Sequence, residues 1–98
     1  MTIEIKRSAE ETTVEVGGRL DTTTAPALDK TLNEDLGDVK NLVIDMKALE
    51  YVSSAGLRVL LSAQKRLHKI GSMKVMNVCE EIMEVFEITG FIDILTIV

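Results

Sequence analysis

Residues 41–61 read NLVIDMKALEYVSSAGLRVLL, and this stretch decides the fold. It opens with the unbroken apolar run Leu42-Val43-Ile44, which is typical of an interior strand covered on both faces. After the small polar segment Ser53-Ser54-Ala55-Gly56, leucines recur at helical spacing from Leu57 onward. A strand that leads directly into a helix predicts one β-α unit of a sheet with parallel strands.

Upstream of this unit, the sequence predicts a hairpin and a helix. Two runs that alternate between apolar and polar residues, Ile3–Ile5 and Val14–Leu20, indicate antiparallel strands, with a bulge or a close backbone approach at Gly17-Gly18. The segment Asp21–Thr24 then supplies possible helix N-caps. A helix that ends at Gly37 is indicated by four apolar residues on one stripe: Ala25, Leu28, Leu32 and Leu36.

Downstream of the unit, two more strands and a helix are expected. Residues 73–78 predict a strand, a third helix begins near Glu80 and ends at Gly90, and residues 92–97 predict a last strand. The order is β-β-α-β-α-β-α-β. We therefore expect an α/β fold in which a single mixed β-sheet carries the helices, within one domain that spans residues 1–98.

The composition narrows the range of functions. Sixteen acidic and eleven basic residues give a net charge of −5, which argues against binding to a nucleic-acid backbone. The single cysteine, Cys79, excludes an internal disulfide and a multi-thiolate zinc site. The single histidine, His68, removes most metal and catalytic-triad chemistry. No apolar run resembles a signal peptide or reaches the roughly 18–20 residues of a membrane span. We expect a cytoplasmic protein with no catalytic residue, metal, cofactor, nucleic-acid partner or membrane contact.

The serine pair Ser53-Ser54 is the most informative polar position. Either serine stands where a helix N-cap belongs, and from spacing alone capping is the simpler role for Ser54. Helix N-termini favour anions such as phosphate, so Ser54 is alternatively a site that a partner approaches, with Gly56 leaving room for that partner. A nucleophilic serine is a third interpretation. It is disfavoured because His68, the only candidate base, lies roughly 20 Å further along the same helix.

These residues carry a resemblance to a known family. Leu42-Val43-Ile44-Asp45, followed at this distance by Tyr51–Leu57, resembles the STAS domain of bacterial anti-sigma factor antagonists and of sulfate transporters. Gly18-Arg19-Leu20-Asp21 matches the family's second signature, a glycine, two variable residues and an aspartate. Thr89-Gly90-Phe91 is similar to the family's turn before the last strand. Because no membrane segment precedes the domain, a stand-alone regulator is expected rather than a transporter tail.

The resemblance implies a STAS-like fold and a partner switch. It implies that Ser54 is the phosphoacceptor. Ser53 is the second choice, because this chain has a second hydroxyl where the family commonly has Asp. The implied partners are an anti-sigma factor with serine kinase activity, which binds the unmodified chain, and a serine phosphatase. The implied partner-binding residues are Asp21, Thr22, Thr23, Ser53, Gly56 and Leu57.

Two further expectations complete the hypothesis. We expect the chain to be a monomer that regulates transcription through its partner. The alternative function is a non-switching STAS scaffold subunit of a transport complex or of another regulatory complex.

Overall fold

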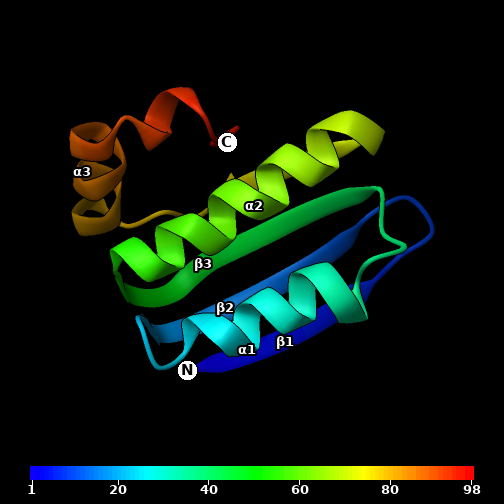
Figure 1. Ribbon diagram of the computed structural model, residues 1–98, viewed down its shortest axis with the longest axis horizontal. Helices are drawn as coiled ribbons and strands as arrows, with labels where there is room; N and C mark the ends of the chain where they lie inside the picture. The colour runs from blue at the N-terminus through cyan, green and yellow to red at the C-terminus, as the bar shows by residue number, and fades with distance from the viewer.

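Figure 1 shows the computed structural model, which describes every residue from Met1 to Val98. One sheet contains the strands β1 (Thr2–Arg7), β2 (Thr12–Leu20), β3 (Asn41–Val52) and β4 (Ser72–Met76). The α-helices are α1 (Ala25–Lys30), α2 (Ser54–Ile70) and α3 (Glu80–Thr89). Two short helical turns complete the structure, the π-helical turn η1 (Thr31–Asp35) after α1 and the 3-10 turn η2 (Phe91–Asp93). None of the helices combines the length and apolar character needed to cross a membrane.

The sheet is mixed, which confirms the expected fold class. Its strand order is β1-β2-β3-β4, with β1 antiparallel to β2 and with β3 parallel to both of its neighbours. The β1–β2 hairpin closes where the N–H and the hydroxyl of Ser8 donate to the carbonyl of Glu11, at 3.0 and 2.7 Å. The register of β2 against β3 shifts between Glu15 and Gly17 and again after Gly18, so the irregularity lies where it was expected, but the extra residues are in β3. Gly17 itself is a place of close approach, because a Cβ there would lie 2.6 Å from Oγ1 of Thr2.

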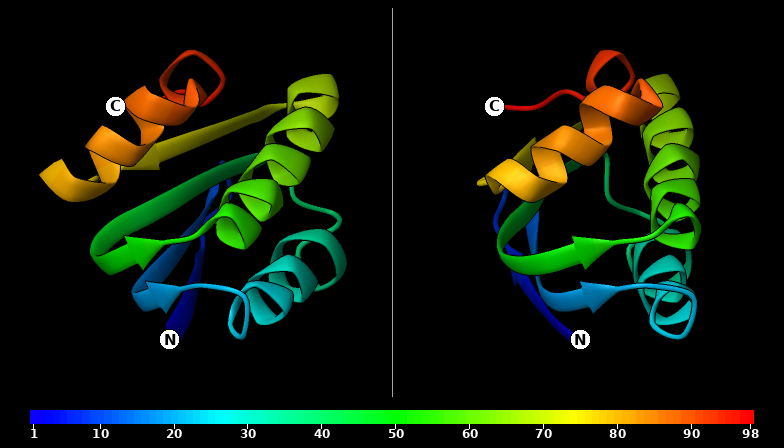
Figure 2. Two further views of the ribbon diagram at one scale, coloured as in Figure 1. Left: turned by 60° about the vertical axis from the view of Figure 1, so that its left-hand side comes forward. Right: turned by 90° about the vertical axis from the view of Figure 1, so that its left-hand side faces the viewer.

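The helices and one face of the sheet enclose the core. α1 and α2 lie beside each other on that face, and α3 packs at the β4 end of the same core (Figure 2). The predicted apolar stripe is confirmed, because Leu28, Leu32 and Leu36 are at most 1% exposed. The stripe continues from α1 through a π-helical turn, which the spacing did not predict. Arg66 of α2 secures this turn by donating to the carbonyl of Leu32 at 2.6 Å.

The expectation of a full last strand at residues 92–97 was wrong. Gly90 ends α3 in the left-handed region, with φ 82°, and the chain then tightens into η2. Only the last residues reach β4, where one parallel bridge joins Val75 to Ile97. Val75 N–H donates to Thr96 O at 2.8 Å, and Val98 N–H donates to Val75 O at 3.0 Å.

Residues 42–44 lie in an interior strand, as expected, but the cover expected on both faces comes from a helix layer on one face only. Leu42 and Ile44 join the core beneath the helices, whereas Val43 is not part of that core and by strand alternation belongs to the opposite face. No helix covers that face of the sheet (Figure 2). Val43 is nevertheless only 6% exposed. It lies between its register partners Thr13 of β2 and Lys74 of β4, so neighbouring strands are enough to bury it.

Candidate functional site

The C-terminal ends of β2 and β3 bring two turns together. The register pairs Leu20 with Val52, and the N–H of Ser53 donates to the carbonyl of Leu20 at 2.8 Å. The turn that leads from β2 into α1 therefore lies beside the turn that leads from β3 into α2 (Figure 1). These two neighbouring turns contain the sequence-predicted residues Asp21, Thr22, Thr23, Ser53 and Ser54.

The structure separates the roles of the two serines. Ser53 is the N-cap of α2, with extended backbone angles, and its Oγ accepts a hydrogen bond of 3.5 Å from the N–H of Gly56. Ser54 begins the helix and is exposed, and its hydroxyl makes no hydrogen bond to another protein group. The simpler interpretation, in which Ser54 caps the helix, was therefore wrong. The hydroxyl of Ser54 stands free at the positive end of a 17-residue helix.

Asp21 organises the turn beside the serines. Its Oδ1 accepts hydrogen bonds from the N–H of Thr23 at 3.0 Å, from the hydroxyl of Thr23 at 2.8 Å and from the N–H of Thr24 at 3.2 Å. These bonds lower the pKa of Asp21 below its ordinary value, and the hydroxyl of Thr23 has the largest effect. Thr22 and Thr23 are exposed, so the turn presents two hydroxyl-bearing side chains in front of a fixed carboxylate.

Gly56 and Leu57 were expected on the partner-binding surface, but the structure places them beneath it. Both residues are buried, Leu57 with 7% of its surface exposed. A Cβ at Gly56 would lie 2.6 Å from Cγ of Leu20 and 3.0 Å from Cγ2 of Val52. The missing side chain therefore lets the first turn of α2 pack closely on the ends of β2 and β3. Our expectation that it opens a path for a partner was wrong, because the glycine faces the core.

The arrangement does not resemble a hydrolase. His68 is exposed in the last turn of α2, whereas Ser54 begins the same helix. At about 1.5 Å of rise per residue, the helix separates the two side chains by roughly 20 Å, far beyond hydrogen-bonding distance. Within one chain, Ser54 has no histidine that accepts its proton.

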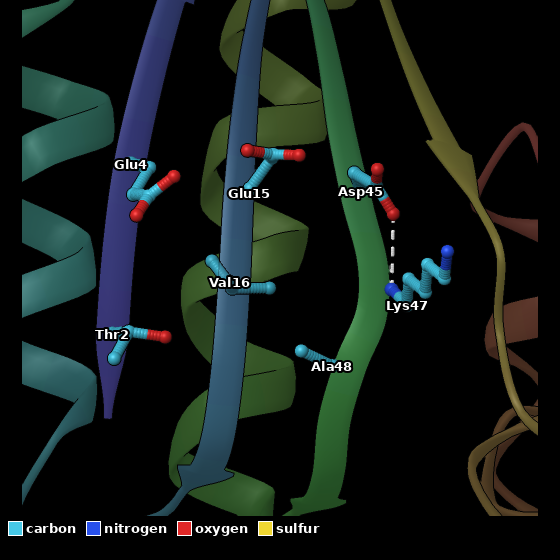
Figure 3. Close-up of a pocket in the computed structure, with 7 residues that line it drawn as sticks. All are labelled: Thr2, Glu4, Glu15, Val16, Asp45, Lys47 and Ala48. Atoms are coloured by element: carbon cyan, nitrogen blue, oxygen red, sulfur yellow. Dashed lines mark hydrogen bonds between the residues drawn. The ribbon is translucent and has the colours of Figure 1, made fainter.

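A separate hollow lies on the sheet face without helices (Figure 3). It has a volume of about 400 Å³ and is lined by Thr2, Glu4, Glu15, Val16, Asp45, Lys47 and Ala48. The register sets Glu4 opposite Glu15, and Glu15 beside Asp45, so three carboxylates form a row across the sheet. Lys6 lies 3.1 Å from Glu15 and offsets part of this charge. The row is not a cluster that could hold a metal ion, and it lies on the opposite face from α2.

One contact near the serines was missed by sequence reasoning. Arg19 and Tyr51 are register partners at the ends of β2 and β3. The guanidinium carbon of Arg19 lies 4.1 Å from the centroid of the Tyr51 ring, and its Nε lies 3.8 Å from Oδ2 of Asp21. Strand alternation carried a signal for this contact, because both residues precede buried ones, Leu20 and Val52, and so face the other side of the sheet.

The sequence of the chain is similar to those of known proteins. The family model of the STAS domain matches residues 2–98. The chain is 31% identical over 96 residues to the anti-sigma-B factor antagonist of Bacillus subtilis strain 168, which covers 97% of this chain and 88% of that protein.

Solved structures are similar as well. The structure of an anti-sigma factor antagonist from Mycobacterium paratuberculosis is 27% identical, with a TM-score of 0.88 over 98% of this chain and 83% of that one. The Bacillus cell fate determinant SpoIIAA in its phosphorylated form is 16% identical, with a TM-score of 0.75 over 99% of this chain and 91% of that one. The second likeness concerns the fold alone.

Replacing Gly56 with Ala tests the close packing beneath Ser54. We expect Gly56→Ala to lower the free energy of unfolding by about 1–3 kcal/mol, because the added methyl group overpacks against Leu20. The loss should occur although Ala favours helix by roughly 1 kcal/mol over Gly. Urea denaturation measures the change, and Ser62→Ala, exposed on the same helix, is the control that should not destabilise. Equal or greater stability of Gly56→Ala would contradict the packing described here.

Replacing Asp21 with Asn tests the charged turn. The lowered pKa means that the Asp21 carboxylate stabilises the folded state above its ordinary pKa of about 4, and that this stability is lost as pH falls through the folded-state pKa. Asn keeps an accepting oxygen but removes the charge. We therefore expect Asp21→Asn to be less stable than the unchanged chain at pH 7, with the difference shrinking below pH ~4. Urea denaturation across this pH range measures it, and a difference independent of pH would be the opposing result.

Proposed function

The chain belongs to the STAS domain family, and we propose that it acts as an anti-sigma factor antagonist. In this proposal, the chain binds an anti-sigma factor with serine kinase activity while Ser54 is unmodified. The bound anti-sigma factor no longer holds its sigma factor, so transcription from the dependent promoters proceeds. Phosphorylation of Ser54 releases the chain, and a serine phosphatase resets it. Identity of 31% to the antagonist of Bacillus subtilis, over 97% of this chain, supports the proposal.

The observation that carries the proposal is the free hydroxyl of Ser54. A kinase needs an acceptor oxygen that reaches solvent and is not engaged inside the protein. Ser54 is exposed and makes no hydrogen bond within the chain, whereas Ser53 is half-buried and caps α2 through the N–H of Gly56. This difference favours Ser54 over Ser53 as the phosphoacceptor.

The transfer itself requires nothing from this chain except the acceptor. The Oγ of Ser54 forms a bond to the γ-phosphorus of ATP held by the kinase, while the bond from that phosphorus to the bridging oxygen of ADP breaks. ADP leaves, and the hydroxyl proton passes to a base of the kinase. In the reverse half of the cycle, water attacks the phosphoserine under the action of the phosphatase and releases inorganic phosphate.

Charge explains how the modification acts as a switch. Phosphorylation adds about −1.5 to −2 charges at neutral pH. The fold tolerates this charge, because it develops in solvent at a helix N-terminus, where unpaired N–H groups favour a phosphate. In a complex, the same charge is buried at an interface, where an unpaired charge costs roughly 2–5 kcal/mol. Affinity then falls by about 10- to 1,000-fold, at 1.4 kcal/mol for each factor of ten.

The proposal also implies a location and an assembly. Sigma factors act on RNA polymerase, so the chain would work in the cytoplasm, as one copy bound to one site on its partner. Neither nucleic acid nor a membrane takes part in the exchange.

Phosphorylation by the cognate kinase tests the proposal. The chain is incubated with the anti-sigma factor kinase of the same organism and with ATP, and the modified residue is mapped by mass spectrometry. We expect phosphate on Ser54 in the unchanged chain and in Ser53→Ala, and none in Ser54→Ala. Phosphate on neither serine would overturn the mechanism.

Binding of the same variants tests the switch. Isothermal titration should give Ser54→Ala an affinity for the kinase similar to that of the unchanged chain. Ser54→Asp supplies one negative charge, and we expect it to bind about 10-fold more weakly or worse. Equal affinity of all three chains would indicate the alternative function, a permanent scaffold that does not switch.

A further inference from the structure

We propose that Arg19, stacked on Tyr51, forms a second anchor for the anti-sigma factor and receives a carboxylate of that partner. This inference rests on the proposed function and extends its interface beyond the serine. It assigns Arg19 and Tyr51 to partner recognition and predicts an acidic side chain on the opposing surface of the partner.

The pair lies next to the turns that contain the serine and Asp21. Arg19 lies in β2, two residues before Asp21, and Tyr51 lies in β3, three residues before Ser54. The side chain of Arg19 is 61% exposed, and Tyr51 is 41% exposed although it is a large aromatic residue. A partner that covers the two turns at the ends of β2 and β3 meets this pair at the rim.

Contacts within the chain hold the guanidinium of Arg19 in place, but its N–H donors make no hydrogen bond to the protein. The Tyr51 ring, 4.1 Å away, supports one face of the guanidinium. The guanidinium of Arg19 donates no hydrogen bond to a protein acceptor, and Asp21 contributes only an ion pair, with 3.8 Å between Nε of Arg19 and Oδ2 of Asp21. The Oδ1 of Asp21 is occupied by Thr23 and Thr24, so that carboxylate is committed to its own turn. The N–H donors of Arg19 therefore remain available, and the stacked side chain loses less conformational freedom on binding.

The charges around Arg19 indicate which group of a partner it binds. Residues 18–24 and 50–57, which form the two turns and the strand ends leading into them, contain one base, Arg19, and two acids, Asp21 and Glu50. Arg58, exposed one helical turn after Ser54, is the next base on the helix side. On the side of the strand ends, Arg19 is therefore the residue that attracts a carboxylate of a partner. The planar fork of arginine fits a carboxylate through two parallel hydrogen bonds. Arg19 therefore fixes the orientation in which the partner binds. Arginine and tyrosine are among the residues enriched at interface hot spots.

The experiment measures binding of the kinase identified by phosphorylation of Ser54. We expect Arg19→Ala to weaken binding by about 30-fold or more, the loss that defines an interface hot spot. Arg19→Lys, which keeps the charge but loses the fork, should show most of that loss. Tyr51→Leu, which removes the ring, should weaken binding less than Arg19→Ala, and Tyr51→Phe, which keeps the ring, should bind like the unchanged chain.

A matched control separates local recognition from net charge. Lys74→Ala removes one positive charge from an exposed strand residue that makes no ion pair, and we expect a change of less than about twofold. Thermal unfolding of every variant establishes that the fold is retained. Charge exchange gives the positive result: Arg19→Glu should lose binding and recover it when the facing carboxylate of the partner is replaced by Lys.

The outcomes distinguish the inference from the proposed function. If Arg19→Ala binds as tightly as the unchanged chain, while Ser54→Asp still weakens binding, the anchor at Arg19 is wrong and the serine switch stands. If the unchanged chain neither binds the kinase nor receives phosphate, the proposed function itself fails. An equal effect of Lys74→Ala and Arg19→Ala would reduce the role of Arg19 to general charge and overturn the anchor.

Discussion

The candidate site depends on the close approach of α2 to the end of β2. The N–H of Ser53 donates to the carbonyl of Leu20 at 2.8 Å, and Gly56 has no side chain where a Cβ would meet Leu20. Together these contacts fix where α2 begins and which residue of its first turn faces solvent. The same contacts hold the Asp21 turn beside the helix. Without them, the hydroxyl of Ser54 would have no defined surroundings for a partner to recognise.

This rigid arrangement suits a switch that acts through charge and not through refolding. The exposed position of Ser54 lets the fold carry a phosphate, because nothing inside the chain has to move away from it. In the proposed switch, discrimination arises at the interface, where the same phosphate would be deprived of water. Arg19 adds a fixed positive point beside the acids Asp21 and Glu50, which in the proposed complex would favour one orientation of the partner.

Much of this structure was predictable from the pattern of residues, and the exceptions have physical reasons. The leucine stripe of α1 and the irregular strand pairing at Gly17-Gly18 follow from local rules of spacing and backbone freedom. The last strand failed because Gly90 turns the chain into a 3-10 turn, a choice that local apolarity does not reveal. The roles of Gly56 and Arg19 depend on how β2 and β3 pair. Strand alternation indicates the face on which Arg19 lies, but no local pattern indicates that Tyr51 is its partner on β3.

The most direct test of the account uses the chain with a genuine phosphoserine at Ser54. Amide hydrogen exchange and affinity for the anti-sigma factor kinase are measured on the same phosphorylated sample and on the unmodified chain. We expect protection in α2 and β3 to be unchanged while affinity falls by at least about tenfold. Undiminished affinity would contradict the claim that the phosphate weakens the complex. A loss of protection that spreads through α2 would contradict the claim that the phosphate leaves the fold unchanged.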